Sequence, residues 1–312
     1  MVDFRYHVVS IVAVFLALGI GIIVGTTTLN GPILDDLQGK TTNLAKNNTS
    51  LQGRIDDLTD QVSAGRAFDT ALLPYAVQGR LAGQTVALVS GPGVGSDLRR
   101  DVTAALRAAG ATVNADVQLR PAFADPDQDA TLGALAGKLA GDAGLPAGSG
   151  IQQATTQLAS VLLTAPGAEA NPIGALRTSL DAYSQAQLVT VHGSSPRPAG
   201  VAVVLADNAP GNATQARAVA DALLTLTTSL DAHGKGAVLA GTAAAAGADG
   251  ALTRAAHDAG FGDHASSVPQ ADQPSGRIAL VFALQQQLAG HAATFSTPAD
   301  AVNAAPSPSP TP

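Results

Sequence analysis

Residues 85–119, TVALVSGPGVGSDLRRDVTAALRAAGATVNADVQL, contain two β-rich apolar runs on either side of a helical stretch. The first run, 85–90, is followed by a loop of glycine and proline, and a helical pattern then covers 97–109. Gly110 is expected to end that helix, because glycine is favoured just after a helical C-terminus. A second strand is expected near 112–119, so the stretch predicts a βαβ unit.

The same pattern recurs in the C-terminal half of the chain. Further strands are predicted at 200–206, GVAVVLA, and 236–241, GAVLAG, and further helices at 213–230, 249–259 and 278–291. Strands that are buried on both faces have continuous apolar runs, as these do. We therefore predict an α/β fold with a mostly parallel sheet flanked by helices. The alanine-rich stretch 124–186 has helical spacing and is expected to add a helical layer.

The composition excludes several classes of function. The chain has 312 residues, a formal net charge of −7 and only 13% charged side chains, about half the usual share of roughly 25%. An acidic chain without a basic tract is not expected to bind nucleic acid, because neutralising phosphates requires clustered lysine and arginine. Cysteine is absent and Met1 is the only methionine, which excludes disulfides, thiolate zinc sites and iron–sulfur clusters.

The run from Val8 to Leu29, VVSIVAVFLALGIGIIVGTTTL, has 22 residues without a charge. About 20 apolar residues cross a hydrocarbon core of roughly 30 Å, so this run predicts a transmembrane helix in contact with lipid. The alternative is a cleaved signal peptide, but signal cores have about 7–15 residues and no A-x-A cleavage pattern follows. Arg5 precedes the span and Asp35 is the first charge after it. The positive-inside rule then predicts a cytoplasmic N-terminus and an extracytoplasmic remainder.

One face of the predicted span carries only small side chains. Ala13, Ala17, Gly21 and Gly25 recur every four residues. Small residues at this spacing let two helices approach closely in lipid, where packing drives association. We expect this face to form a homodimer contact. The alternative is that it reflects the general frequency of glycine and alanine in membrane helices.

Apolar residues then repeat every 3.5 positions beyond Gly31 and Pro32, where we expect one helix to end and another to start. The repeat comprises Leu34, Leu37, Thr41, Leu44, Asn48, Leu51, Ile55, Leu58 and Val62. An a/d pattern over about four heptads predicts a dimeric coiled coil, in which a buried Asn48 would set a parallel register. Gly39 and Gly53 lie outside the seam and each cost about 1 kcal/mol of helix propensity. The alternative is one amphipathic helix that lies on the globular domain.

These features divide the chain into four predicted parts. A cytoplasmic start and transmembrane anchor cover 1–30, a coiled coil covers 31–65, an extracytoplasmic α/β domain covers 66–297, and a Pro/Ser tail covers 298–312. The tail ends in APSPSPTP, in which alternating prolines favour an extended, disordered chain.

The loop 91–96, GPGVGS, follows a predicted strand and opens a helix, as phosphate-binding loops do. Ser96 stands where a G-x-G-x-x-G fingerprint needs glycine, and the Gly-Lys-Ser/Thr end of a P-loop is absent. Asp116 lies at roughly the 20-residue distance of a ribose-binding acid. We interpret the loop as a tight turn and predict no nucleotide cofactor.

The sequence contains no convergent catalytic set. His192 is followed by Ser194 and Ser195 in VHGSSPRP, but residues adjacent in sequence do not form a triad, and no G-x-S-x-G nucleophile elbow is present. We therefore predict that the chain is not an enzyme. Catalysis on the α/β body is the last of the hypotheses considered.

Metal ligands are limited to histidines and carboxylates. The tightest cluster is HDAGFGDH, 257–264, in which His257, Asp263 and His264 are candidates for a nitrogen and oxygen site for Cu(II). The His-x6-His spacing fits no helical or hairpin pair, so we interpret the cluster as a surface turn between a helix and a strand, with the metal site as the alternative. Cu(I) prefers sulfur, for which the chain offers only Met1.

The segment DFRYHVVSIVAVFLALGIGIIVGTTTLNGPILDDLQ, residues 3–38, resembles the start of the actinobacterial copper transport protein family MctB. Residues 7–25 are its most specific part, and the order of start, span, coiled coil and α/β body is similar too. The resemblance implies a cell-envelope protein with a role in copper efflux or homeostasis, and it is the basis for considering copper as a ligand. A related branch, SteB, implies control of cell-wall biogenesis and peptidoglycan hydrolysis through the coiled coil.

Two hypotheses follow for the function of the chain. One is a role in copper export or tolerance, from the resemblance. The other is a non-enzymatic dimeric scaffold whose coiled coil binds another envelope or cell-wall protein. The span itself offers no copper pathway, because a single helix encloses no pore and its polar groups are limited to Ser10 and the threonines near its end.

Overall fold

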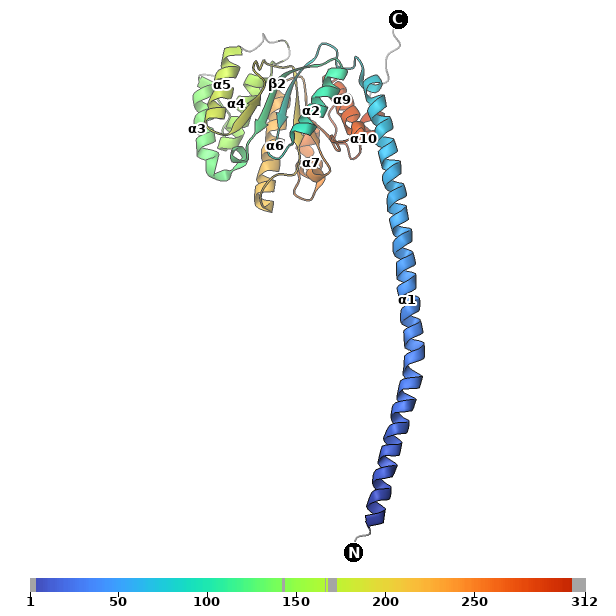
Figure 1. Cartoon of the computed structure of the whole chain (residues 1–312). Helices are drawn as coiled ribbons and strands as arrows, with labels where there is room; N and C mark the ends of the chain where they lie inside the picture. The colour runs from blue at the N-terminus through green and yellow to red at the C-terminus, as the bar shows by residue number, and fades with distance from the viewer. Residues whose placement is uncertain (1–3, 142–143, 166, 168–172, 305–312) are drawn as a thin grey trace. The chain divides into compact units, whose positions relative to one another are not determined.

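The structure is a computed structural model that describes residues 4–141, 144–165, 167 and 173–304 (Figure 1). Contacts between residues divide the chain into two compact units, Met1–Gly65 and Arg66–Pro312. Helix α1, Phe4–Val77, forms the described part of the first unit and contributes the first residues of the second.

Helix α1 is continuous, so the expected helix end at Gly31 and Pro32 is wrong. A proline inside a helix removes one backbone donor and bends the helix, while the hydrogen bonds on either side can continue it. The segment Phe4–Thr26 of α1 has 23 residues, a mean hydropathy of 2.8 and no part buried against the described chain. This length and this apolar, exposed surface match the predicted membrane span.

The second unit is built on a six-stranded sheet. Its strands are β1 (Thr85–Ser90), β2 (Thr112–Leu119), β3 (Val189–His192), β4 (Val201–Ala206), β5 (Ala237–Gly241) and β6 (Ser266–Val268). They lie in the order β3-β2-β1-β4-β5-β6, and only β2 and β3 pair antiparallel. The predicted mostly parallel sheet is confirmed, and β1 and β2 have the predicted limits.

Helices surround this sheet in the described part of the second unit. They are α2 (Ser96–Ala108), α3 (Asp129–Ala140), α4 (Gly150–Leu162), α5 (Ile173–Gln185), α6 (Ala213–His233), α7 (Ala251–His257), α8 (Ala259–Gly262), α9 (Pro274–Leu288) and α10 (Pro298–Asn303), with 3-10 turns at η1 (Pro121–Ala124), η2 (Pro126–Gln128) and η4 (Ala244–Ala246). The helical layer predicted at 124–186 is present as α3, α4 and α5 (Figure 1).

The core lies on both faces of the sheet, because side chains alternate along each strand. In β1, Ala87 and Val89 belong to the apolar cluster that includes α4, α5 and α6. Val86 and Leu88 belong to the cluster on the other face, with α2, α9 and the end of α1. Burial on two faces explains why the strands have continuous apolar sequences.

Two predicted helices have different limits. The helix expected at 249–259 is divided into α7 and α8, because Asp258 has an extended backbone (φ −98, ψ 102) and its carboxylate accepts hydrogen bonds from the first backbone N–H groups of α8. The helix expected at 278–291 is α9, which begins earlier, with Pro274 in its first turn, where a missing N–H costs nothing.

The tail expected from residue 298 begins with a helix. Thr297 and Asp300 form a capping box at the start of α10, and Ala301 is fully buried. This capping and burial stabilise a short helix that composition alone did not indicate. The sequence APSPSPTP, 305–312, lies outside the described residues.

Candidate functional site

Strands β2 and β3 present polar side chains on the face of the sheet that lies next to α2. In β2, Ala115, Val117 and Leu119 point into the core, so the alternating Asn114, Asp116 and Gln118 face the other way. The antiparallel register places His192 of β3 opposite Asp116 and Thr190 opposite Gln118. Directly opposed residues share a face of the sheet. The two strands therefore present a row of polar side chains on the face next to α2.

Helix α2 forms the wall beside this row. Ser96, Arg99, Thr103 and Arg107 are three or four residues apart and lie along one side of the helix. Two adjoining hollows of about 290 and 400 Å³ lie between α2, β2 and the end of β3, and both are lined by Thr103, Arg107, Asp116 and His192. We call this continuous concavity the α2/β3 groove. The residues that complete its lining are Ser96, Arg99, Arg100, Ala104, Val113, Asn114, Ala115, Gly193, Ser194, Ser195 and Pro196.

An ion pair and a hydrogen-bond network cross the groove. Arg99 Nη1 lies 3.3 and 3.4 Å from the two carboxylate oxygens of Asp116, and the Arg99 side chain is only 13% exposed. Gln118 donates from Nε2 to the Val94 carbonyl at 3.0 Å, and its Oε1 lies 3.3 Å from Nε2 of His192. Because Oε1 is an acceptor, Nε2 of His192 carries a proton in this arrangement.

The cations of α2 differ in how they are neutralised. Arg100 pairs with Asp97 at 2.7 Å and lies 3.4 Å from Asp101. Arg107 is exposed and forms no hydrogen bond or ion pair through its side chain with any residue that the structure describes. The groove therefore has one uncompensated guanidinium, in a chain whose net charge is −7.

The structure brings together several residues that the sequence presented separately. Asp116, His192, Ser194 and Ser195 all line the α2/β3 groove, although α3, α4 and α5 lie between β2 and β3 in the chain. The sequence signal was the alternation of polar and apolar residues in TVNADVQL, which indicates a strand with one face outside the core. Their arrangement depends on the antiparallel pairing of β3, which this alternation does not specify.

The glycine loop after β1 is held by its neighbours. Gly91 N–H donates to the Leu205 carbonyl at 2.8 Å, and Val94 receives the Gln118 bond. Gly93 has a φ of +91, and a Cβ there would lie 2.2 Å from the Asn208 carbonyl oxygen. The loop needs glycine for its left-handed turn and for this close backbone approach.

The candidate copper ligands lie on the surface around α8. His257, Asp263 and His264 are all exposed, and Nδ1 of His257 lies 2.7 Å from the Thr253 carbonyl, one turn back in α7. Helix α8 separates the two histidines. Within the described ranges, no three histidine, aspartate or glutamate side chains come together in a geometry that holds a metal ion.

The residues predicted to form contacts between chains lie along α1. Ala13, Ala17, Gly21 and Gly25 are in the apolar segment, and a Cβ added at Gly21 or Gly25 would meet no atom within 4 Å. Of the seam, Leu44, Asn48, Leu51, Ile55 and Leu58 are exposed, and only the backbone of Leu37 is described. Pairing through either face stays a prediction.

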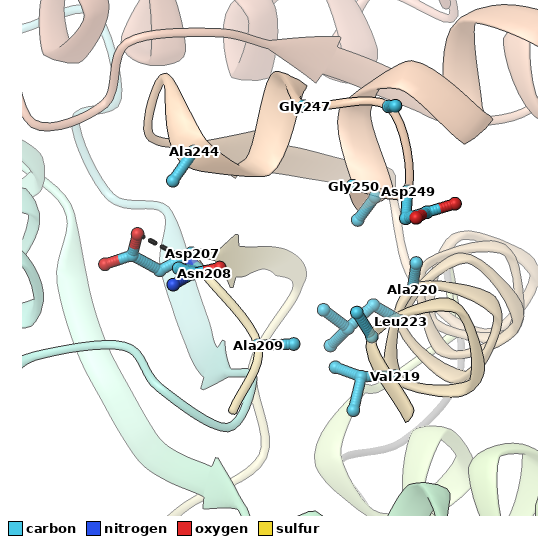
Figure 2. A pocket seen from close by; sticks show the side chains of 13 residues that line it. Asp207, Asn208, Ala209, Val219, Ala220, Leu223, Ala244, Gly247, Asp249 and Gly250 are labelled. Carbon is cyan, nitrogen blue, oxygen red and sulfur yellow. Dashed lines mark hydrogen bonds between the residues drawn. The ribbon is translucent and has the colours of Figure 1, made fainter. Parts of the chain in front are cut away.

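A second cavity, of about 230 Å³, lies at the carboxyl ends of β4 and β5 (Figure 2). Ala209 on one side and Val219 and Leu223 of α6 on the other point toward one another in it. At its rim, Asp207 accepts a hydrogen bond from Thr242 Oγ1 at 2.6 Å, and Asp249 pairs with Arg217 at 2.6 Å. Ligands of parallel α/β sheets bind at this edge, but the lining here is mainly small and apolar.

The apolar segment of α1 and the doubly wound sheet define a membrane-anchored α/β protein. The chain belongs to the MctB family, since the family model described as "Copper transport outer membrane protein, MctB" matches residues 1–306. The match confirms the resemblance found at residues 3–38 and extends it through the α/β body.

Named relatives are similar over nearly the whole chain. The protein named Copper transporter MctB from Mycobacterium tuberculosis (strain ATCC 25618 / H37Rv) is 27% identical over 312 residues, which covers 95% of this chain and 96% of the relative. The protein of the same name from Mycobacterium leprae (strain TN) is 27% identical over 305 residues, covering 93% and 94% respectively.

Proposed function

We propose that this chain takes part in copper export or copper tolerance, with copper as its cargo and not as a resident cofactor. The observation that carries the proposal is the family match over residues 1–306, together with relatives named copper transporters. The position of Arg5 before the span supports a cytoplasmic N-terminus and an extracytoplasmic α/β body.

The proposed role does not require the single helix to conduct copper. Between Val8 and Thr26 the span has no ionisable residue, and one helix encloses no pore. Transport would then need several copies of the chain or a partner protein. The body would act beside the membrane, tethered by α1.

Deletion of the gene tests this proposal. We expect the deletion strain to accumulate cell-associated copper and to become copper-sensitive, and expression of the full chain to restore both properties. Sensitivity to zinc, measured in parallel, should stay unchanged. Equal copper content and equal copper sensitivity with and without the gene would contradict the proposal.

A second candidate function is a non-enzymatic homodimeric scaffold that binds an envelope or cell-wall protein. It is favoured by the surface of α1, where Leu44, Leu51, Ile55, Leu58 and Val62 are between 52% and 69% exposed. A stripe of large apolar side chains at heptad spacing is typical of a helix that pairs with another helix. The SteB branch of the resemblance favours the same role.

Charge substitutions on α1 test the scaffold. Leu51→Asp with Leu58→Asp is expected to abolish crosslinked dimers in membranes and to release any co-purified envelope protein, because each dimer would bury four carboxylates in its seam. Ser50→Asp with Ser63→Asp is the matched control, which adds the same charges outside the seam. Gly21→Ile with Gly25→Ile examines the small face of the span separately. Crosslinking that no variant reduces would exclude both faces.

A further inference from the structure

We propose that the α2/β3 groove binds an anionic ligand through a carboxylate or phosphate group, which Arg107 and the hydroxyls of Ser194 and Ser195 would hold. The groove lies in the α/β body, and the proposal does not depend on copper transport or on pairing of α1. Its two hollows, about 290 and 400 Å³, are comparable with sites for small organic ligands, which are roughly 300–1,000 Å³.

The charges of the groove favour an anion. Arg100 is neutralised by Asp97 and Asp101, whereas Arg107 has no counter-ion among the described residues. Arg99 is only partly neutralised by Asp116, because one nitrogen makes the contact at 3.3 Å, longer than the roughly 2.7–2.9 Å of strong charged hydrogen bonds. A guanidinium presents paired donors that match a carboxylate or phosphate.

Arg99 provides a second observation that favours an anion in the groove. Its Nε is buried and has no hydrogen-bond partner in the described structure. Buried polar groups are nearly always satisfied, so this unpaired N–H is an exception that a bound ligand or water would explain. Together with the guanidinium of Arg107, this leaves hydrogen-bond donors in the groove walls that an incoming oxyanion would satisfy.

The neutral groups in the groove suit an oxyanion. The hydroxyls of Thr103, Ser194 and Ser195 line it without hydrogen bonds to described residues. Hydroxyls donate readily to carboxylate and phosphate oxygens. The lining contains no phenylalanine, tyrosine or tryptophan ring on which a nucleobase would stack, and no three-ligand metal cluster occurs among the described residues.

The loop that carries the two serines is anchored to β2 at its end. Asn114 Nδ2 donates to the Pro198 carbonyl at 2.7 Å, and the Arg197 N–H donates to the Asn114 carbonyl at 2.9 Å. These bonds tie residues 197 and 198, just after the two serines, to Asn114 of β2. A site fixed in this way loses less entropy on binding than a mobile one.

Equilibrium dialysis of the full chain in lipid nanodiscs tests the proposal, with radiolabelled inorganic phosphate and radiolabelled malonate as probes at constant ionic strength. We expect saturable binding of at least one probe, and at least tenfold weaker binding by Arg107→Gln. Arg177→Gln, which removes an exposed arginine of α5, is the matched control and should leave the affinity unchanged. Preference for phosphate or for malonate identifies which oxyanion the groove recognises.

Ser194→Ala with Ser195→Ala provides a variant that keeps every charge. It is expected to weaken binding several-fold, and it replaces Arg107→Gln as the decisive variant if the latter fails to fold by circular dichroism. Absence of saturable binding for both probes, displacement by chloride at equal concentration, or equal loss in the Arg177 variant would overturn the proposal.

Discussion

The hydroxyl of Tyr183 lies in the core between the sheet and α4 and α5, where the residue is fully buried. Its oxygen has no hydrogen-bond partner among the described residues, and burial raises the pKa of the phenol well above 10.0. The ring contacts Phe123, with centroids 6.3 Å apart. The ring therefore contributes apolar packing while the hydroxyl carries an uncompensated desolvation cost.

We predict that Tyr183→Phe leaves the fold intact and raises the free energy of unfolding by about 1 kcal/mol, since it removes a buried group without a partner. Urea denaturation followed by circular dichroism measures this change. Tyr75→Phe is the matched control, because Tyr75 is 78% exposed and should show no effect. A clear loss of stability in Tyr183→Phe would mean that the hydroxyl has a bound partner such as water.

Asp231, near the end of α6, has a carboxylate that folding makes harder to ionise. Burial raises its pKa above the ordinary value of 3.8, and a backbone hydrogen bond at Ala237 and the nearby His264 offset part of that effect. Because the folded state binds this proton more tightly than the unfolded state, the contribution of Asp231 to stability falls as pH rises from about 3.8 through the raised pKa.

Asp231→Asn is therefore predicted to remove this decrease, so that the variant gains stability relative to the parent as pH rises through that window. Urea denaturation midpoints measured at intervals from about pH 3.5 upward supply the comparison. This range starts below the pKa of an unfolded aspartate, which is about 3.9. Asp181→Asn, an exposed aspartate of α5, is the control. Parallel pH profiles for Asp231→Asn and the parent would show the prediction to be wrong.

At the scale of the element, two glycines in and just after α1 show that the cost of adding a side chain depends on backbone conformation and not on available space. A Cβ at Gly53 would meet no atom within 4 Å, and Gly79, just after α1, is equally open. Gly53 is helical, however, whereas Gly79 has a φ of +72. Alanine fits the first conformation and is strained in the second.

We predict that Gly53→Ala stabilises the surrounding helix by about 1 kcal/mol, and that Gly79→Ala destabilises the body by roughly 1–2 kcal/mol. Amide hydrogen exchange near each position measures both changes. Slower exchange at Gly79→Ala would contradict the conformational explanation, since the two sites differ in φ and not in crowding.

Strands illustrate which elements local sequence can predict. β1, β4 and β5 are continuous apolar runs, and the sequence located each of them to within a residue. The limits of β3 and β6 were not predicted, because they have four and three residues and pair at the edges of the sheet. Strands this short show no usable periodicity, so their existence depends on the neighbour that supplies their hydrogen bonds.

For the whole molecule, the stability of the α/β body and that of α1 have different sources. Leu88 is fully buried in the cluster formed with α2 and α9, whereas Leu44 of α1 is 69% exposed. Leu88→Ala is predicted to lower the free energy of unfolding by about 2–5 kcal/mol, through lost burial and the cavity left behind. Urea denaturation of the full chain measures it.

Leu44→Ala serves as the comparison and also examines pairing. In a monomer an exposed leucine contributes within about 0.5 kcal/mol, so Leu44→Ala should have little effect. A larger effect that grows with protein concentration would indicate that α1 pairs with another copy, because oligomers gain stability by mass action.

Local sequence is sufficient for the apolar span, the α/β class and most helix positions, because those features depend on residues close together in the chain. It misplaced the helix end at Gly31 and Pro32, where the backbone continues through a proline. The groove that joins Asp116 to His192 follows from the antiparallel pairing of β2 with β3, and the division of the helix at Asp258 sets the surroundings of His257 and Asp263. These are properties of the tertiary structure, since only packing of distant segments brings such side chains within reach of one another.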